Sequence, residues 1–169
     1  MKELWDLYDE NRKKLDKKVY RGEKLEDGEY HLVVNAWIRN CEGKYLMSKR
    51  SAKKNHPFLW ECTGGSVIKG EDTINGAYRE VKEELGIDIT SSDRVLIGTT
   101  KRYYLNNNDI LDVYLFFYNI NIEDIKFTDG EVMDVKWMSK EEIIQLAEEN
   151  QLETTSFLNE VLNYKKIEK

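Results

Sequence analysis

Three glutamates near the middle of the chain, Glu80, Glu83 and Glu84, have the spacing of neighbours on one helical surface. A helix advances by about 100° per residue, so their side chains fall within an arc of roughly 100°. Carboxylates at this spacing repel one another, and the helix dipole disfavours anions near a helix C-terminus. A hard divalent cation relieves both penalties, because Mg²⁺ and Mn²⁺ prefer carboxylate oxygens. The spacing therefore predicts a divalent-metal site.

Other residues around this helix could complete the site. Glu71 stands just before the helix and can reach back toward the same carboxylates. Arg79 can pair with one of the glutamates and hold it in register. The glycines Gly64 and Gly65 should let the backbone turn tightly and come close to a ligand, so we include Gly64 in the predicted metal site.

The segment 65–87 matches the Nudix box, Gly-x5-Glu-x7-Arg-Glu-U-x-Glu-Glu-x-Gly-U, in which U is an aliphatic residue. All nine specified positions are filled, by Gly65, Glu71, Arg79, Glu80, Val81, Glu83, Glu84, Gly86 and Ile87. A chance match of nine positions at rigid spacing is very improbable. The chain thus resembles the Nudix (MutT-like) family over roughly residues 30–150. The resemblance implies an α/β fold, the Nudix-type α/β/α sandwich with a central mixed sheet.

The same resemblance implies a pyrophosphohydrolase. It would hydrolyse a diphosphate linkage in a nucleoside diphosphate derivative or similar small molecule, with Mg²⁺ or Mn²⁺ as cofactor. The divalent ion would neutralise the diphosphate and activate the attacking water. The implied metal ligands are Glu80, Glu83 and Glu84, with Glu71 as a supporting carboxylate and Arg79 orienting the cluster. Glu131, ahead of a late strand, is the candidate for a ligand or base outside the box, and we include it among the catalytic residues with Glu80, Glu83 and Arg79.

Basic and aromatic side chains flanking the box are candidates for substrate binding. The possible phosphate binders are Lys49, Arg50, Lys53 and Lys54, of which Arg50 is the strongest candidate. The possible stacking partners for a base or apolar group are Phe58, Trp60, Tyr103 and Tyr104. The alternatives are a solvated basic loop for the first set and core packing for the second.

The periodicity of the chain places this site among strands and helices. We expect strands at 3–8, 19–20, 31–39, 45–50, 60–63, 94–104, 109–120 and 131–138, and helices at 72–85, 139–149 and 154–166. Either Asp72 or Thr73 can cap the central helix, and Gly86 suits a left-handed C-cap. We divide the chain into an N-terminal strand or hairpin-like extension, 1–29, and a Nudix domain with the C-terminal helices, 30–169.

Composition limits the classes of partner and compartment. The chain has 169 residues, 40% of them apolar, which suits one domain. A net charge of -6 argues against a nucleic-acid partner, and no apolar run is long enough to span a membrane. Two cysteines and no signal-peptide pattern favour a reducing, cytoplasmic location. A homodimer is possible, because the N-terminal segment could pair across a two-fold axis.

Two other functions fit parts of the sequence. The N-terminal segment and the Trp60 region resemble isopentenyl-diphosphate isomerases, but the essential cysteine of those enzymes falls at about Gly65, and Cys62 is offset by three residues. A non-catalytic nucleotide-binding Nudix module usually loses box glutamates, and none is lost here. Because no basic residue follows it closely, Cys62 is expected to be a buried or spectator thiol. His31 and His56 lack a metal-ligand pattern, so we expect structural or surface roles for them.

Overall fold

A computed structural model describes residues 2–127 and 130–166. The model does not describe residues 1, 128–129 and 167–169, which fall within the predicted segments 1–29 and 30–169. The elements are β1 (Leu4–Tyr8), β2 (Lys14–Tyr20), β3 (His31–Arg39), β4 (Tyr45–Arg50), β5 (Trp60–Glu61), β6 (Thr63–Ser66), α1 (Thr73–Leu85), β7 (Asp93–Arg102), β8 (Asp109–Phe117), the short 3₁₀ helix η1 (Ile122–Asp124), β9 (Val132–Met138), α2 (Lys140–Glu148) and α3 (Leu158–Asn163). No helix in these described ranges is both long and apolar enough to cross a membrane.

A seven-stranded mixed sheet forms the centre of the molecule. Strand β3 pairs in parallel with β8 along its whole length, and β8 pairs antiparallel with β7. On its other side β3 pairs with β6, and β4 pairs with β5 and β9. Both faces of β3 are buried, which explains its nearly continuous run of apolar residues.

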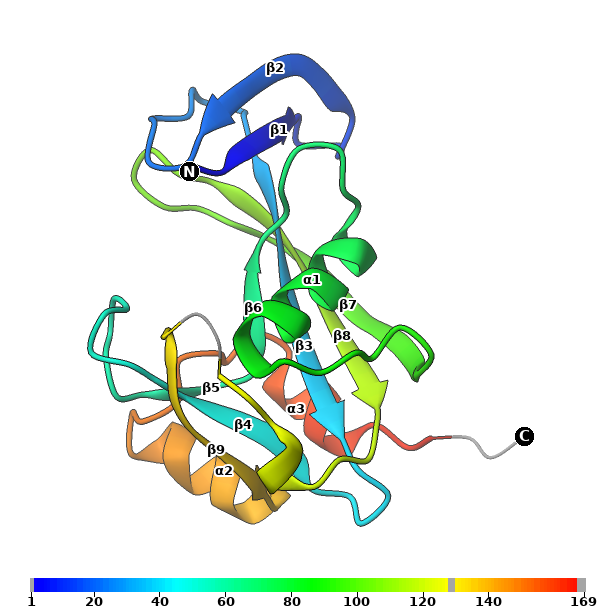
Figure 1. Cartoon of the computed structure of the whole chain (residues 1–169). Coiled ribbons are helices and arrows are strands. Elements are labelled where there is room, and N and C mark those ends of the chain that lie inside the picture. Colours follow the sequence, from blue (N-terminus) through cyan, green and yellow to red (C-terminus); the bar gives the residue numbers. More distant parts are fainter. Residues whose placement is uncertain (1, 128–129, 167–169) are drawn as a thin grey trace.

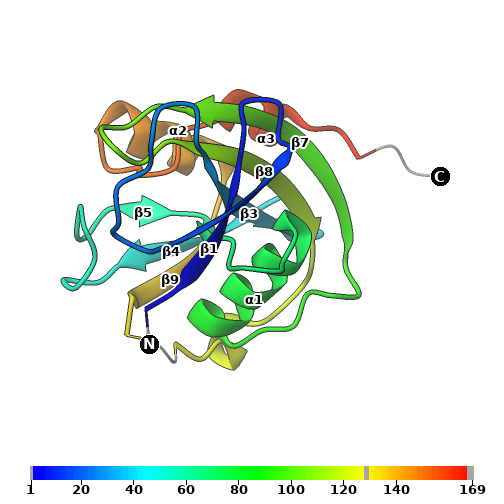
Figure 2. The same ribbon diagram turned by 90° about the horizontal axis from the view of Figure 1, so that it is seen from above.

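Helices cover the two faces of this sheet, α1 on one side and α2 with α3 on the other (Figure 2). One apolar cluster includes Ala77, Val81 and Leu85 of α1. A second cluster, on the opposite face, includes Ile143 of α2 and Val161 of α3. The α/β/α sandwich with a mixed sheet, as expected from the sequence, is confirmed.

Strands β1 and β2 form a separate two-stranded sheet, which lies above the loop that precedes α1 (Figure 1). This hairpin has its own small apolar cluster, formed by Trp5, Leu7, Val19 and Leu25. The Asp6 carboxylate accepts a hydrogen bond from the Gly70 amide, and the Lys69 amide donates to the Leu4 carbonyl. The N-terminal hairpin is therefore attached to the box loop, while the predicted domain division at residue 29 stays a prediction.

An ion pair between a partly exposed guanidinium and a buried carboxylate ties the turn of this hairpin to the central sheet. Both guanidinium nitrogens Nη1 and Nη2 of Arg12 donate to the Asp112 carboxylate on β8. Asp112 also accepts the hydroxyl hydrogens of Thr73 and Thr99, both at 2.6 Å. Although burial opposes it, these hydrogen bonds lower the pKa of Asp112. Since Thr73 is the first residue of α1, the network fixes the start of the helix that carries the box.

The C-terminal region differs from the sequence-based expectation. A helix was expected over residues 154–166, but α3 covers only Leu158–Asn163. The preceding segment instead pairs with β5, because the Trp60 amide donates to the Gln151 carbonyl and the Glu153 amide donates to the Trp60 carbonyl. The Thr154 hydroxyl also accepts the Cys62 amide hydrogen. Phe157 then takes a left-handed conformation, φ 56°, so the helix cannot begin earlier.

His31 is buried beneath the N-terminal hairpin. Its ring stacks on Trp5 with 4.0 Å between ring centroids, and only 2% of the residue is exposed. Neither ring nitrogen has a hydrogen-bond partner among the described residues. Burial therefore lowers the pKa of His31 to about 4. The structural role expected for this histidine agrees with its position.

This shift predicts an acid-sensitive contribution to stability. Below the unfolded pKa of about 6.5, the unfolded chain takes up a proton that the folded chain excludes. The free energy of unfolding should fall between about pH 6.5 and pH 4, by up to about 3 kcal/mol from this group. Urea unfolding of wild type and His31→Phe at pH 7 and pH 5 measures it. The phenylalanine variant should gain stability relative to wild type at pH 5. An equal difference at both pH values would contradict the assignment.

Candidate active site

Helix α1 presents the predicted carboxylates because both of its ends are fixed. The Asp72 side chain accepts the Asn75 amide hydrogen at the N-terminus, and Gly86 closes the C-terminus in the left-handed conformation. Its buried stripe of Ala77, Val81 and Leu85 packs on the sheet. The neighbouring stripe therefore faces the loop at residues 51–59, where Glu84 contacts Lys54.

The box arginine holds three of the box glutamates. Arg79 Nε donates to the Glu71 carboxylate at 3.0 Å, and Nη1 donates to Glu80 at 2.9 Å and to Glu83 at 3.0 Å. Nη2 donates to the Ser66 carbonyl on β6. Burial opposes the charge of Arg79, but the carboxylates around it raise its pKa further. The predicted orienting role of Arg79 thus has a geometric basis.

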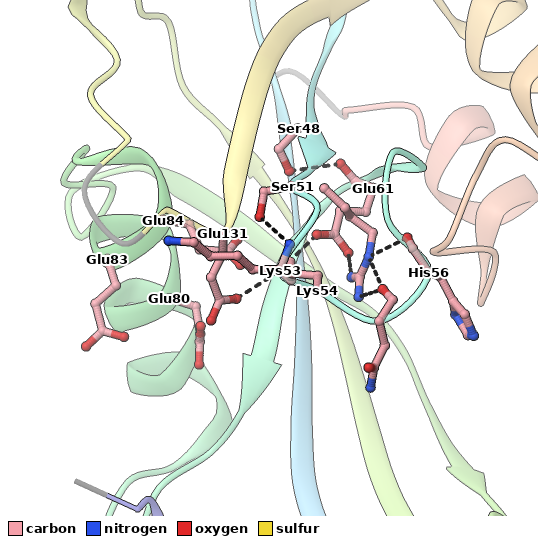
Figure 3. A network of polar contacts seen from close by, with 12 residues as sticks. Ser48, Ser51, Lys53, Lys54, His56, Glu61, Glu80, Glu83, Glu84 and Glu131 are labelled. Atoms are coloured by element: carbon pink, nitrogen blue, oxygen red, sulfur yellow. Dashed lines mark hydrogen bonds and ion pairs between the residues drawn. The ribbon is translucent and has the colours of Figure 1, made fainter.

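The fourth glutamate of the box lies deeper and has a different partner. Glu84 is 2% exposed, and one of its oxygens, Oε1, accepts a hydrogen bond from Lys54 Nζ at 2.9 Å. The same ammonium lies 3.0 Å from a Glu61 oxygen and 3.2 Å from a Glu131 oxygen. Figure 3 shows these side chains converging from α1, β5 and the start of β9, with Glu83 on the outer side of the group. Glu131 is therefore placed beside the box, as a ligand or base outside it would have to be.

The protonation equilibria of the site differ from those in water. Burial raises the pKa of Glu84 to about 8, although the Lys54 ammonium opposes the rise. Burial likewise raises the pKa of Glu80 to about 7 against the effect of Arg79. Burial also disfavours the charge on Lys54, but Glu84 and Glu61 raise its pKa above the ordinary value. Ionisation of Glu80 and Glu84 thus costs free energy, and a bound divalent cation would offset this cost.

The donor set fits a hard divalent cation. It consists of carboxylate oxygens, and Glu84 Oε2 is buried without a hydrogen-bond partner within residues 2–127 and 130–166. Among the described residues, no group of three or more His, Cys, Asp or Glu side chains is arranged so that it could hold a metal ion. The reason is visible in the contacts above, since Arg79 and Lys54 divide the carboxylates between them. The predicted ligand roles of Glu71, Glu80, Glu83 and Glu84 stay predictions.

The two glycines at the start of the box leave room for neighbouring groups and do not form a turn. Gly64 and Gly65 lie inside β6, opposite Asn35 and Val34, and neither has a positive φ. A Cβ atom on Gly64 would lie 2.5 Å from the Val34 carbonyl oxygen, and one on Gly65 would overlap the Glu80 carboxylate. The expected tight turn is therefore wrong, while the expected close approach to a ligand stays a prediction. A role for Gly64 at the metal stays a prediction.

The close approach at Gly65 predicts a selective loss of activity. In Gly65→Ala the added methyl group must push the Glu80 carboxylate away from β6, because no space exists between them. We expect hydrolysis to fall by about 10-fold to 100-fold, with the fold preserved, since a displaced metal-site group costs about that much. Steady-state kinetics and circular dichroism test this, and the control is Gly43→Ala at a distant hairpin turn, where the φ of 80° should cost stability but not activity. Wild-type kinetics in Gly65→Ala would contradict it.

The predicted substrate-binding residues take varied positions. Arg50 pairs with Glu61 and donates to the carbonyl oxygens of Asn55 and His56, so it organises the loop 51–59. Lys49 lies over the Trp60 ring, 5.6 Å from its centroid, and Trp60 itself is 7% exposed within the second apolar cluster. Phe58 is 49% exposed and Tyr103 67% exposed. Contact of these residues with substrate stays a prediction.

Sequence reasoning missed Glu61 altogether. Its side chain lies on β5, is 5% exposed and contacts both Arg50 and Lys54. The available signal was an acidic residue inside the short apolar strand that leads into the box, where an unpaired charge would be costly. Lys54 was considered for phosphate binding, whereas its place among three carboxylates requires the folded arrangement.

Cys62 and His56 have no part in this site. Cys62 is fully buried in the second apolar cluster, on the sheet face away from α1, and burial raises the pKa of its thiol. Its expected role as a buried spectator thiol agrees with this position. His56 is exposed and contacts Glu153 on the outer side of the loop.

Comparisons with known proteins agree on one family. The profile of the NUDIX domain matches residues 29–159. An uncharacterized Nudix hydrolase of Listeria monocytogenes, lmo0368, is 37% identical over 166 residues, which cover 96% of this chain and 95% of that protein. An isopentenyl-diphosphate Delta-isomerase of Citrobacter koseri is 28% identical over 118 residues, 68% of this chain and 65% of the isomerase. The fold resembles the crystal structure of DR0079 from Deinococcus radiodurans, with a TM-score of 0.75, 20% identity, and coverage of 94% of this chain and 97% of that one.

Proposed function

Because the chain belongs to the Nudix family, we propose that it hydrolyses a diphosphate linkage in a small molecule with the help of Mg²⁺ or Mn²⁺. The substrate class is a nucleoside diphosphate derivative or a similar diphosphate. One observation carries the proposal: the Glu84 carboxylate, near the end of the box helix, is buried with an oxygen that no described residue satisfies. A buried acceptor of this kind is costly unless it has a ligand.

The residues of the site have separable tasks in this reaction. Glu80, Glu83 and Glu84 would hold the divalent ion, which when bound would neutralise the diphosphate and activate water. Arg79 keeps Glu71, Glu80 and Glu83 in fixed positions through the hydrogen bonds described above. Glu131, which lies 3.2 Å from Lys54 Nζ, would accept a proton from the attacking water or serve as a further ligand.

The basic loop supplies charge on the opposite side of the site. The Lys54 ammonium lies among the carboxylates of Glu84, Glu61 and Glu131, and Lys49, on the neighbouring strand β4, lies over the Trp60 ring. When released from these partners, the two cations would contact the phosphate oxygens and stabilise the charge that develops on the leaving group. Both cysteines are free thiols, which supports a reducing, cytoplasmic location. Homodimer formation stays a prediction.

The test is a hydrolysis screen on the purified full chain. Nucleoside diphosphate sugars, dinucleoside polyphosphates, nucleotides and isoprenoid diphosphates are each supplied with Mg²⁺, with Mn²⁺ or with a chelator. We expect phosphate-containing products from at least one class, and loss of product with the chelator. Isomerisation of isopentenyl diphosphate without hydrolysis, or nucleotide binding without turnover, would contradict the proposal.

A further inference from the structure

We propose that Lys54 is a tethered cation that competes with the divalent ion for the carboxylates of the site, so that ion binding must displace its ammonium group. This inference rests on the proposed function only in taking the divalent ion to bind at Glu84. It gives Lys54, a loop residue outside the box, a part in controlling whether the metal site is occupied.

The contacts of Lys54 resemble those of a bound cation. Its ammonium has three donors, and it lies 2.9 to 3.2 Å from oxygens of three carboxylates, on Glu84, Glu61 and Glu131. Only 13% of the side chain is exposed, and Figure 3 shows it lying among Glu61, Glu84 and Glu131. Within the described chain these carboxylates come from three separate elements. Lys54 is thus the charge that holds them together.

A divalent ion and this ammonium group cannot keep the same partners. An ion that binds Glu84 would use oxygens that now accept hydrogen bonds from Lys54, and the two positive charges would repel each other across a partly desolvated space. The ion of higher charge is the stronger competitor. The free energy of ion binding becomes less favourable by the amount needed to separate Lys54 from its carboxylates.

The loop allows this exchange without disturbing the sheet. Its ends are fixed, since the Arg50 amide donates to the Leu59 carbonyl and the Ser51 amide donates to the Glu131 carbonyl. Between them the Lys54 backbone has one long hydrogen bond, 3.3 Å from its amide nitrogen to the Ser51 carbonyl oxygen. A flexible four-carbon side chain can leave the carboxylates by rotation alone. The released ammonium then stands beside the position proposed for the diphosphate, so the exchange links ion binding to substrate contact.

Calorimetric titration with Mn²⁺ alone tests the competition. Wild type, Lys54→Met and Lys53→Met are titrated at pH 7 without substrate. Lys53 carries the same charge one position away but is exposed, so it controls for the general loss of positive charge. We expect Lys54→Met to bind Mn²⁺ about tenfold more tightly than wild type, the size expected for one charged hydrogen bond, and Lys53→Met to change affinity less than threefold. Equal or weaker binding by Lys54→Met would overturn the proposal.

A second measurement keeps the wild-type side chain in place. In ¹⁵N nuclear magnetic resonance spectra, the Lys54 Nζ signal should be observable without metal, because its hydrogens are held in hydrogen bonds, and should broaden or shift on titration with Mg²⁺. An unchanged signal at saturating Mg²⁺ would reject displacement even if Lys54→Met failed to fold. Hydrolysis with an unchanged signal would contradict this inference alone. Displacement of Lys54 without hydrolysis of any diphosphate would contradict the proposed function alone.

Discussion

Replacing Glu84 with glutamine is expected to reduce hydrolysis of the best substrate by about 10³-fold, because it removes the most deeply buried charge of the proposed metal site. An amide has nearly the same volume but only one oxygen, and it carries no charge to attract the ion. The fold should survive, since burial already disfavours the charged form and raises the pKa of Glu84 to about 8. Initial rates at saturating Mg²⁺ and thermal unfolding of the same sample measure the two effects.

The control for this substitution is Glu141→Gln, which makes the same chemical change at an exposed position in the first turn of α2. It should retain wild-type rates. Glu83→Gln gives a graded comparison, since the Glu83 side chain is 55% exposed and contacts Arg79. Full activity in Glu84→Gln would show that the site lies elsewhere.

Replacing Asp112 with alanine is expected to destabilise the fold by about 2 to 3 kcal/mol, because it removes the buried charged acceptor of several hydrogen bonds. Asp112 is 1% exposed and accepts hydrogen bonds from Arg12, Thr73 and Thr99. Its removal leaves a half-buried guanidinium and two hydroxyl groups without their acceptor. Urea unfolding monitored by tryptophan fluorescence gives the change in the midpoint and in the free energy of unfolding.

A double-mutant cycle separates the ion pair from the other contacts. Arg12→Met and Asp112→Asn are measured singly and together, and we expect a coupling free energy of about 1.5 kcal/mol or more between them. Thr99→Val, which removes only one hydrogen bond, should cost about 1 kcal/mol. Additive effects of the two substitutions would mean that Arg12 and Asp112 do not stabilise each other.

The sequence was sufficient wherever the determining interactions are local. The C-cap at Gly86 and an N-cap at Asp72, one of the two expected residues, were confirmed, because each depends on residues within about one helical turn. The Nudix resemblance was also confirmed, since the box is a short pattern of fixed spacing. The match to isomerases extends over less of the chain and at lower identity than the match to Nudix hydrolases.

What escaped prediction depends on partners far apart in the chain. Lys54 lies next to Glu84 only because β4, β5 and α1 meet, and nothing in the loop sequence distinguishes it from Lys53. Arg50 appeared suited to bind phosphate, but the fold gives it a buried carboxylate, Glu61. The final helix was predicted too long for the same reason, because Thr154, at its expected start, accepts the Cys62 amide hydrogen and the residues just before it pair with Trp60. Local helix propensity takes no account of such long-range partners.

The parallel pairing of β3 with β8 also bears on the order in which the molecule assembles. This pairing joins His31 to Asp109, and the whole box lies within the segment that it closes. Such long-range closure loses conformational entropy before its contacts form, so it is slow and comes late in folding. Helix α1 can form early from its own hydrogen bonds, but Glu61 and Glu131 reach Lys54 only after β4 has paired with β5 and β9. The proposed divalent-ion site is therefore a property of the completed sheet, acquired at the end of folding and not with the helix that carries the box.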